Sequence, residues 1–283
     1  MPLKHISVIG AGTMGNGIAQ VCATSGYDVT LIDVSKDALK RAKETIAGSV
    51  KKLHSKDKLS DEARDRALNN IKTATDMKAA AEADMVIEAA TENKPLKLKL
   101  FAELDEIMRP GVILASNTSS ISITEIAAAT KRPEHVVGVH FMNPVPLMEL
   151  VEIIRGYATS AETLHTVLEL TRSLGKTPVE AADYPGFISN RVLCPMINEA
   201  IFAVMEGVGT PEAIDTVMKL GMNHPMGPLT LADFVGLDVV LAVMDVLYDG
   251  YGDPKYRACP LLRKMVAAGH LGKKTGRGFY TYE

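Results

Sequence analysis

His140 and Glu152 lie inside the apolar stretch VVGVHFMNPVPLMELVEII, where neither side chain is needed for packing. An ionisable ring and a carboxylate in such surroundings favour a chemical role. If the two side chains meet, Glu152 fixes the tautomer of the imidazole ring and stabilises its protonated form. The pair then predicts a general base that works near neutral pH.

Two consecutive strands would bring this pair together. The apolar run Val136–Met142 predicts one strand, Asn143 and two prolines interrupt it, and Leu147–Ile154 predicts the next. Because side chains alternate along a strand, Glu152 points the same way as its apolar neighbours two residues before and after it. A hairpin would set Glu152 beside His140, whereas the alternative is a solvated hairpin tip with an incidental His and Glu.

A glycine-rich turn near the amino terminus adds a second chemical feature. The run His5–Ile9 predicts a strand, GAGTMG follows it, and Asn16–Ser25 has the small and apolar residues of a helix. In this order Gly10 permits a tight turn, Gly12 lets the backbone approach a pyrophosphate, and Gly15 lets the helix pack on the strand. The predicted cofactor-binding loop consists of Gly10, Gly12, Thr13, Met14 and Gly15. A turn that serves packing alone is the alternative.

A carboxylate follows the glycines at the distance typical of dinucleotide-binding proteins. The predicted strand Asp28–Ile32 ends in Asp33, about 20 residues past the glycine loop, where it would hold a ribose 2′-hydroxyl. Asp33 would also repel a 2′-phosphate, and no arginine follows it directly, although Lys36 lies nearby. The sequence therefore predicts NAD rather than NADP as the cofactor.

Further alternation of strands and helices indicates the fold class. The apolar runs Met85–Ala89 and Val112–Ala115 flank an amphipathic helix from Pro95 to Met108. This pattern predicts an α/β fold with a Rossmann-type, mostly parallel sheet, whose strand ends bring Ser119 and His140 to one rim. Ser119 would hydrogen-bond a substrate oxygen there, and the serines around it also suit a helix N-cap.

The composition changes near Tyr184. Beyond it the chain reads as helical, which predicts an NAD-binding domain over residues 1–184 and an all-helical C-terminal domain over residues 185–283. The expected helices are Asn190–Glu206, Pro211–Leu220, Leu229–Tyr248 and Leu261–Ala268. Asn190, at the start of the first of them, would reach into the cleft or cap its helix.

Charge and composition limit the partners. The 283 residues are 47% hydrophobic with a net charge of −3, which suits a globular enzyme and argues against a general nucleic-acid partner. No run reaches membrane-spanning length, and the first strand leaves no room for a signal peptide, so we expect a cytoplasmic protein. Cys22, Cys194 and Cys259 are scattered and are expected to be buried free thiols, with neither a metal-binding nor a catalytic role.

One segment is strongly basic. From Lys36 to Lys58, eight cations and three anions give a net charge of +5, on a stretch with helical spacing of apolar residues. A polyanion would fit such a helix, but exposed lysines are common, and by itself the pattern favours a solvated helix face.

Seven motifs in the expected order resemble the short-chain L-3-hydroxyacyl-CoA dehydrogenase family, and within it the 3-hydroxybutyryl-CoA dehydrogenases. They are GAGTMG, Asp33, ASNTSS, HFMNPVPLMELVEI, PGFISNR, MNHPMGPLTLADFVGLD and GKKTGRGFY. The resemblance covers essentially the whole chain. It implies an NAD-dependent oxidoreductase that interconverts (S)-3-hydroxybutyryl-CoA and acetoacetyl-CoA and forms a homodimer.

The resemblance also implies roles for individual residues. His140 would be the catalytic base and Glu152 its orienting carboxylate, with Ser119 and Asn190 beside the reacting groups. The implied NAD contacts include Glu92, Lys97, Ser119, Asn143 and Lys274. Ser49 and Lys56 match coenzyme A contacts, which overrides the solvated-face interpretation of the basic helix. Two alternatives remain: a β-hydroxyacid dehydrogenase that acts on a free acid, and a non-enzymatic, crystallin-like NAD-binding protein.

Overall fold

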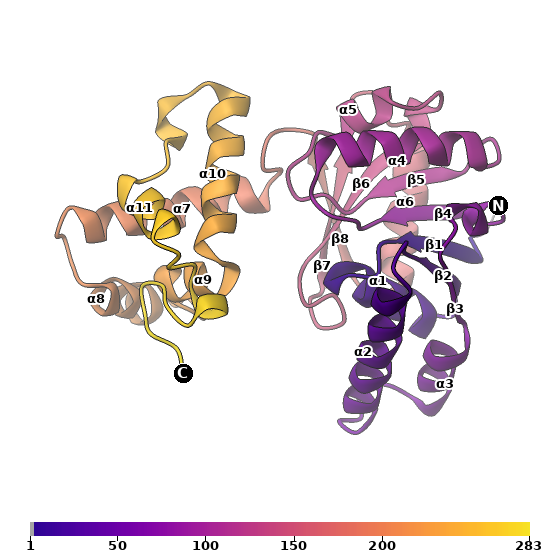
Figure 1. Ribbon diagram of the computed structural model, residues 1–283, viewed down its shortest axis with the longest axis horizontal. Coiled ribbons are helices and arrows are strands. Elements are labelled where there is room, and N and C mark those ends of the chain that lie inside the picture. The colour runs from indigo at the N-terminus through magenta and orange to yellow at the C-terminus, as the bar shows by residue number, and fades with distance from the viewer. Residues whose placement is uncertain (1–2) are drawn as a thin grey trace. The chain divides into compact units, whose positions relative to one another are not determined.

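The computed structural model describes residues 3–283, which form two compact units; the first ends at Asp183 and the second begins at Tyr184. The first unit is built on an eight-stranded sheet in the order β3-β2-β1-β4-β5-β6-β7-β8 (Figure 1). The strands are β1 (His5–Ile9), β2 (Asp28–Ile32), β3 (Ile71–Ala74), β4 (Met85–Glu88), β5 (Ile113–Ser116), β6 (Val136–Phe141), β7 (Leu150–Arg155) and β8 (Thr177–Ala182). Only β6 and β7 pair antiparallel among these strands, so the predicted mostly parallel α/β sheet is confirmed.

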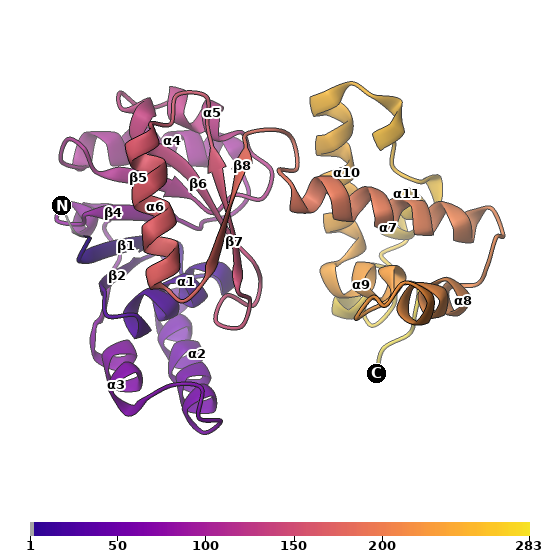
Figure 2. The same cartoon turned by 180° about the vertical axis from the view of Figure 1, so that it is seen from behind.

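Helices cover both faces of this sheet. Its helices are α1 (Thr13–Thr24), α2 (Lys36–His54), α3 (Asp61–Asn69), α4 (Lys94–Ile107), α5 (Ile123–Ala128) and α6 (Ala161–Ser173). The helices α4 and α5 lie over one face, and α1 and α6 lie over the other (Figures 1 and 2). The helices α2 and α3 pack against α1 and against each other. Five of the six begin at a residue whose side chain caps the free amides of the first turn: Ser35, Ser60, Asn93, Ser122 and Ser160.

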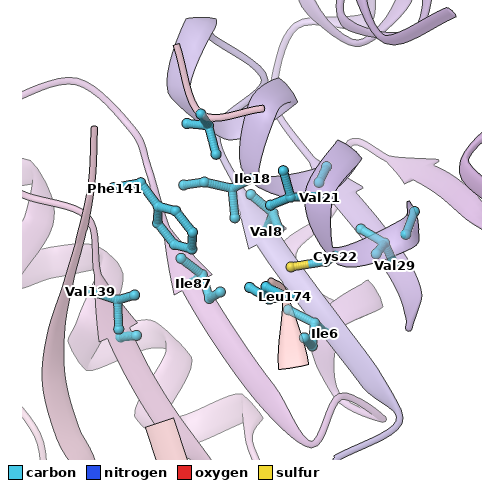
Figure 3. Packing of buried hydrophobic residues seen from close by; sticks show 14 of the residues in the cluster. Ile6, Val8, Ile18, Val21, Cys22, Val29, Ile87, Val139, Phe141 and Leu174 are labelled. Atoms are coloured by element: carbon cyan, nitrogen blue, oxygen red, sulfur yellow. The ribbon is translucent and has the colours of Figure 1, made fainter. Parts of the chain in front are cut away.

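The core between the sheet and α1 follows from strand alternation. In Figure 3, Val8 of β1 and Ile87 of β4 lie on the side of Ile18 of α1, and Ile6 of β1 lies nearer to Cys22 of the same helix. All five are at most 7% exposed. Because alternate residues of a strand point to opposite faces, the intervening residues of the same strands turn toward α4 and α5.

Cys22 belongs to the core of the first unit, and Cys194 and Cys259 belong to the core of the second unit. All three are free and buried, so the expectation of buried thiols is confirmed. Burial raises the pKa of both Cys22 and Cys194 to about 12, because the thiolate would lose its hydration. Both thiols therefore stay protonated at neutral pH and are poor nucleophiles.

The second unit is helical and has its own apolar core. It contains α7 (Ser189–Met205), α8 (Pro211–Thr216), a π-helical turn (Val217–Gly221), α9 (Pro228–Val235), α10 (Leu237–Tyr251) and α11 (Pro260–Ala267). The expectation of one continuous helix from Leu229 to Tyr248 is wrong. Gly236 interrupts it with φ +103°, a conformation that a residue with a side chain rarely adopts, so α9 ends and α10 begins there. No helix within residues 3–283 is both long and apolar enough to cross a bilayer.

Candidate active site

His140 and Glu152 face each other across the antiparallel strands β6 and β7. The Nδ1 atom of His140 lies 2.8 Å from Oε2 of Glu152, and the two residues are only 6% and 1% exposed. An ionised carboxylate only accepts hydrogen bonds. With Glu152 ionised, Nδ1 therefore carries the proton of the neutral ring and donates a hydrogen bond to Glu152. The other ring nitrogen, Nε2, is then the atom that exchanges a proton with a bound molecule.

Strand alternation explains why both side chains point the same way. Val139 and Phe141 of β6, and Val151 and Ile153 of β7, belong to the core under α1 and α6. The residue between each pair therefore turns to the opposite face, and direct cross-strand pairing brings the two together. Apolar packing on one face of the hairpin thus fixes the polar contact on the other.

The turn between these strands differs from the prediction in one respect. The second strand was expected to begin at Leu147, whereas β7 begins at Leu150. The carbonyl of Pro144 accepts the backbone amides of Leu147 and Met148, which closes a turn in place of the first residues of the strand. The ammonium of Lys176 donates to the carbonyls of Val145 and Met148 at 2.8 and 2.7 Å, which fixes the turn further.

Ser119 reaches the same histidine from the loop after β5. Its Oγ lies 3.0 Å from Nε2 of His140. The strands β5 and β6 are parallel neighbours, and the Asn117 side chain accepts the backbone amide of Phe141 at 2.9 Å, so the loop is tied to the end of β6. The N-cap of α5 is Ser122, so the capping function does not fall to Ser119. The structure therefore brings together three predicted site residues, His140, Glu152 and Ser119.

The glycine loop has the geometry of a phosphate-binding turn. Gly10 adopts φ +100°, and a Cβ atom there would lie 2.6 Å from the carbonyl oxygen of Ala89. A Cβ on Gly15 would lie 1.8 Å from the carbonyl oxygen of Gly10, so only glycine lets α1 approach β1 this closely. Gly12 is the N-cap of α1 without a side-chain cap, and a Cβ there would meet nothing within 4 Å. Backbone amides at the helix start thus border open space.

Asp33 stands next to this loop and is held in place by it. Its Oδ2 accepts the amide of Ala11 and its Oδ1 accepts the amide of Ser35, both at 2.8 Å. Each carboxylate oxygen keeps a second lone pair for a ligand hydroxyl. The loop and Asp33 together fit the dinucleotide predicted from the sequence.

A cavity of about 690 Å³ lies between α1, α2 and the turn after β6. Thr13, Ser49, Lys56 and Asn143, all predicted site residues, line it together with Lys52. The apolar side of α2 is buried, which leaves its cations for solvent and for this cavity. The cavity therefore has a basic wall, with Lys52 in the last turn of α2 and Lys56 in the turn that follows, so Lys56 lies beyond the helix on which it was expected.

Four other predicted residues have different surroundings. Lys97 is 1% exposed, with its Nζ 2.6 Å from Oε1 of Glu88 and 3.5 Å from Oε2 of Glu92, which leaves this ammonium little surface for a cofactor. Glu92 keeps 42% of its side chain exposed. Asn190 lies in the first turn of α7, whose N-cap is Ile188, so the helix-capping alternative is wrong.

The last of the four, Lys274, lies in the second unit, where it pairs with Asp238 at 2.7 Å. Sequence reasoning missed the partner of Lys97, the buried Glu88. The signal for that pair was a carboxylate at the end of the apolar strand MVIE, and a lysine at helical spacing from Phe101 and Leu104 on the buried side of α4.

Comparison with known proteins places the chain in a family. A family model described as the NAD binding domain of 3-hydroxyacyl-CoA dehydrogenase matches residues 5–184, and the model of the C-terminal domain matches residues 186–282. A Deinococcus radiodurans protein named probable 3-hydroxybutyryl-CoA dehydrogenase is 59% identical, over 97% of this chain and 99% of its own. The 3-hydroxybutyryl-CoA dehydrogenase of Bradyrhizobium diazoefficiens is 55% identical, over 99% of this chain and 96% of its own.

A solved structure agrees with these relatives. The crystal structure of (S)-3-hydroxybutyryl-CoA dehydrogenase from Ralstonia eutropha matches with a TM-score of 0.97 at 52% identity, and the match covers 99% of each chain. With both family models matched in order along the sequence, the chain belongs to the 3-hydroxyacyl-CoA dehydrogenase family.

Proposed function

We propose that this protein interconverts (S)-3-hydroxybutyryl-CoA and acetoacetyl-CoA with NAD as its cofactor. The observation that carries the proposal is the buried hydrogen bond between His140 and Glu152, with Ser119 on the other ring nitrogen. The three relatives described above are named for this substrate, and this chain matches each of them over nearly its full length.

In the oxidation direction, Nε2 of His140 takes the proton from the 3-hydroxyl group, while NAD, when bound, accepts the hydride that leaves C3. The ring becomes an imidazolium, and the carboxylate of Glu152 stabilises that charge at Nδ1. The hydroxyl of Ser119 orients the substrate oxygen toward Nε2. In reduction the same imidazolium returns its proton to the carbonyl oxygen of acetoacetyl-CoA.

The glycine loop and Asp33 would hold NAD, with Glu92, Asn143 and Lys274 as further contacts. Asn190 would approach the reacting group. We assign residues 1–184 to cofactor binding and residues 185–283 to closure over the cleft and to contact between the subunits of a homodimer. Such an enzyme would act in the cytoplasm.

A turnover assay tests the proposed function. Purified protein mixed with acetoacetyl-CoA and NADH should consume NADH, which is followed by its absorbance, and free acetoacetate should react poorly. Faster reaction with the free acid would identify a β-hydroxyacid dehydrogenase instead. Binding of NADH without turnover of either compound would identify a non-enzymatic protein.

Asp33 should determine the choice of cofactor. Its carboxylate would accept a hydrogen bond from the ribose 2′-hydroxyl and disfavour a 2′-phosphate, so kcat/KM should be higher with NADH than with NADPH. The substitution Asp33→Ala should narrow this preference by about tenfold or more, the effect of one hydrogen bond to a charged group. Asp37→Ala, which removes a nearby exposed carboxylate, is the matched control. A wild-type preference for NADPH would show that Lys36 or another cation outweighs Asp33.

Lys56 should act as a handle for the coenzyme A phosphates. The substitution Lys56→Ala should raise KM for acetoacetyl-CoA by about tenfold, leave KM for NADH nearly unchanged, and make the rate less sensitive to added salt. Steady-state kinetics at several ionic strengths measure all three effects. The binding energy of such a remote group also aligns the acyl group for reaction.

Two controls make the Lys56 result specific. Lys51→Ala removes an exposed cation of the last turn of α2 that does not line the cavity, and it should leave KM near the wild-type value. A truncated thioester without the nucleotide phosphates should react poorly with the wild type and respond little to Lys56→Ala. If the variant treats the full-length and truncated substrates as the wild type does, Lys56 is only a solvated lysine in the turn after α2.

A further inference from the structure

A buried ion pair lies behind the loop that carries Ser119. Glu88, the last residue of β4, is 0% exposed, and Lys97 of α4 is 1% exposed. The Nζ atom of Lys97 lies 2.6 Å from Oε1 of Glu88. Charged groups are rarely buried this completely unless they are paired, since each loses its hydration.

The first connection from this pair to Ser119 runs through the carboxylate of Glu88. Its Oε2 accepts the hydroxyl of Ser116 at 2.7 Å, and that hydroxyl oxygen accepts the amide of Thr118 at 3.2 Å. Glu88 and Ser116 are direct partners at the ends of the parallel strands β4 and β5. The pair therefore fixes the backbone immediately before Ser119.

The second connection runs through Glu92. Lys97 also lies 3.5 Å from Oε2 of Glu92 and donates to the carbonyl of Ala90 at 3.3 Å, which orients the loop between β4 and α4. The Oε1 atom of Glu92 accepts the backbone amides of Ser119 and Ser120 at 3.0 and 3.2 Å. One ammonium thus holds two carboxylates, and each of them binds the serine loop.

We propose that Glu88 and Lys97 are positioning residues that hold Ser119 against His140, with Lys97 acting through Glu92 and Ser116 rather than by contact with NAD. This inference rests on the proposed function for its kinetic consequence. Its structural basis is that Ser119 Oγ reaches Nε2 of His140 from a loop whose backbone is held at consecutive residues by the network. A displacement of about 1 Å in a group at the reacting centre costs about 10²-fold in rate.

The substitution Lys97→Met tests the proposal, since methionine is also unbranched and of similar length but carries no charge. We expect a lower melting temperature, because Glu88 is left buried without a counter-ion. Hydrogen exchange should be faster for the amides of Ser119 and Ser120, as measured by mass spectrometry on their peptide. We also expect kcat to fall about 10²-fold, a larger change than the rise in the dissociation constant of NADH, because Glu92 is only one of several proposed cofactor contacts.

The double variant Glu88→Gln/Lys97→Met separates positioning from charge balance. With both charges removed, the melting temperature should recover, because no unpaired buried charge remains. Exchange at Ser119 and the low kcat should not recover, because Glu92 still lacks its cation. If Lys97→Met alone does not fold, this variant carries the test. Lys99→Met, which removes an exposed lysine from the same helix, is the matched control.

Three results would overturn the proposal. If exchange at Ser119 and kcat recover in the double variant together with the melting temperature, Glu88 and Lys97 serve only to neutralise each other's charge. Weaker NADH binding with an unchanged kcat would show that Lys97 supports the cofactor site and not the position of Ser119. Unchanged exchange at Ser119 in Lys97→Met would show that the loop does not depend on the pair. Should the wild type fail to reduce acetoacetyl-CoA, the proposed function fails, while exchange and stability still decide the structural role of the network.

Discussion

The substitution Glu152→Gln is expected to lower the turnover of acetoacetyl-CoA by about 10²- to 10⁴-fold, the usual range for general acid–base assistance. Glutamine keeps the shape of the side chain but no longer provides the negative charge that stabilises a protonated His140. Affinity for NADH should stay near the wild-type value, because the substitution does not touch the glycine loop. Steady-state kinetics and NADH binding to the same preparation measure both quantities.

Two further variants calibrate this result. His140→Gln should be at least as damaging, because it removes the group that exchanges the proton. Glu149→Gln neutralises an exposed carboxylate just before β7 and should leave turnover near the wild-type value. If Glu152→Gln retains most of its turnover and stays folded, the cross-strand pair is a structural contact and another group supports proton transfer.

The substitution Gly12→Ala is expected to weaken NADH binding by about 10- to 100-fold while the fold stays intact. A Cβ atom at this position meets nothing within 4 Å, so the protein itself accommodates it. The methyl group would instead occupy the space through which a pyrophosphate approaches the backbone amides. Loss of one hydrogen bond to a charged phosphate, about 1.5–3 kcal/mol, gives this magnitude.

Gly15→Ala provides the contrast within the same loop. Its Cβ would lie 1.8 Å from the carbonyl oxygen of Gly10, so α1 must move away from β1. This variant should lose both stability and NADH binding, whereas Gly12→Ala loses binding alone. Calorimetric titration with NADH and thermal unfolding of both variants measure the difference. If Gly12→Ala binds NADH with wild-type affinity, the glycine loop does not contact the cofactor.

Much of the sheet and of the candidate site could be predicted because each depends on local pattern. The strands β1 and β2 match their expected bounds, since both are short apolar runs followed by turn residues or by Asp33. The pairing of His140 with Glu152 could be predicted because each is an ionisable residue between apolar neighbours, in one of two consecutive strands. Such strands pack one face on a core, so their alternation determines which side chains meet.

Other elements gave weaker signals. The edge strand β3 and the helix α3 were not predicted, because β3 buries only Ile71 and α3 buries only Ala63 and Ala67. The helix α6 was also missed, although its buried residues repeat at helical spacing and gave a usable signal. The break at Gly236 was overlooked because one glycine in a long apolar run does not reveal its φ angle.

The network around Lys97 shows a different limit. Pattern alone places a lysine on the buried side of α4 and a glutamate at the end of β4, but their contact depends on how the loop between these two consecutive elements folds. Whether the ammonium meets a ligand or a carboxylate depends on distances of a few ångströms in the folded chain. The structure therefore changes the expected role of Lys97, although the residue itself was recognised.

Isotope transfer from the cofactor to the substrate shows directly whether the protein catalyses the proposed reaction. The wild-type protein is incubated with acetoacetyl-CoA and NADH that carries deuterium at both C4 positions, and the products are analysed by mass spectrometry. We predict 3-hydroxybutyryl-CoA with one deuterium, located at C3, and very little product from His140→Gln. Product without deuterium, or no hydroxybutyryl-CoA from a folded protein that binds NADH, would show that the protein does not transfer hydride from NADH to C3.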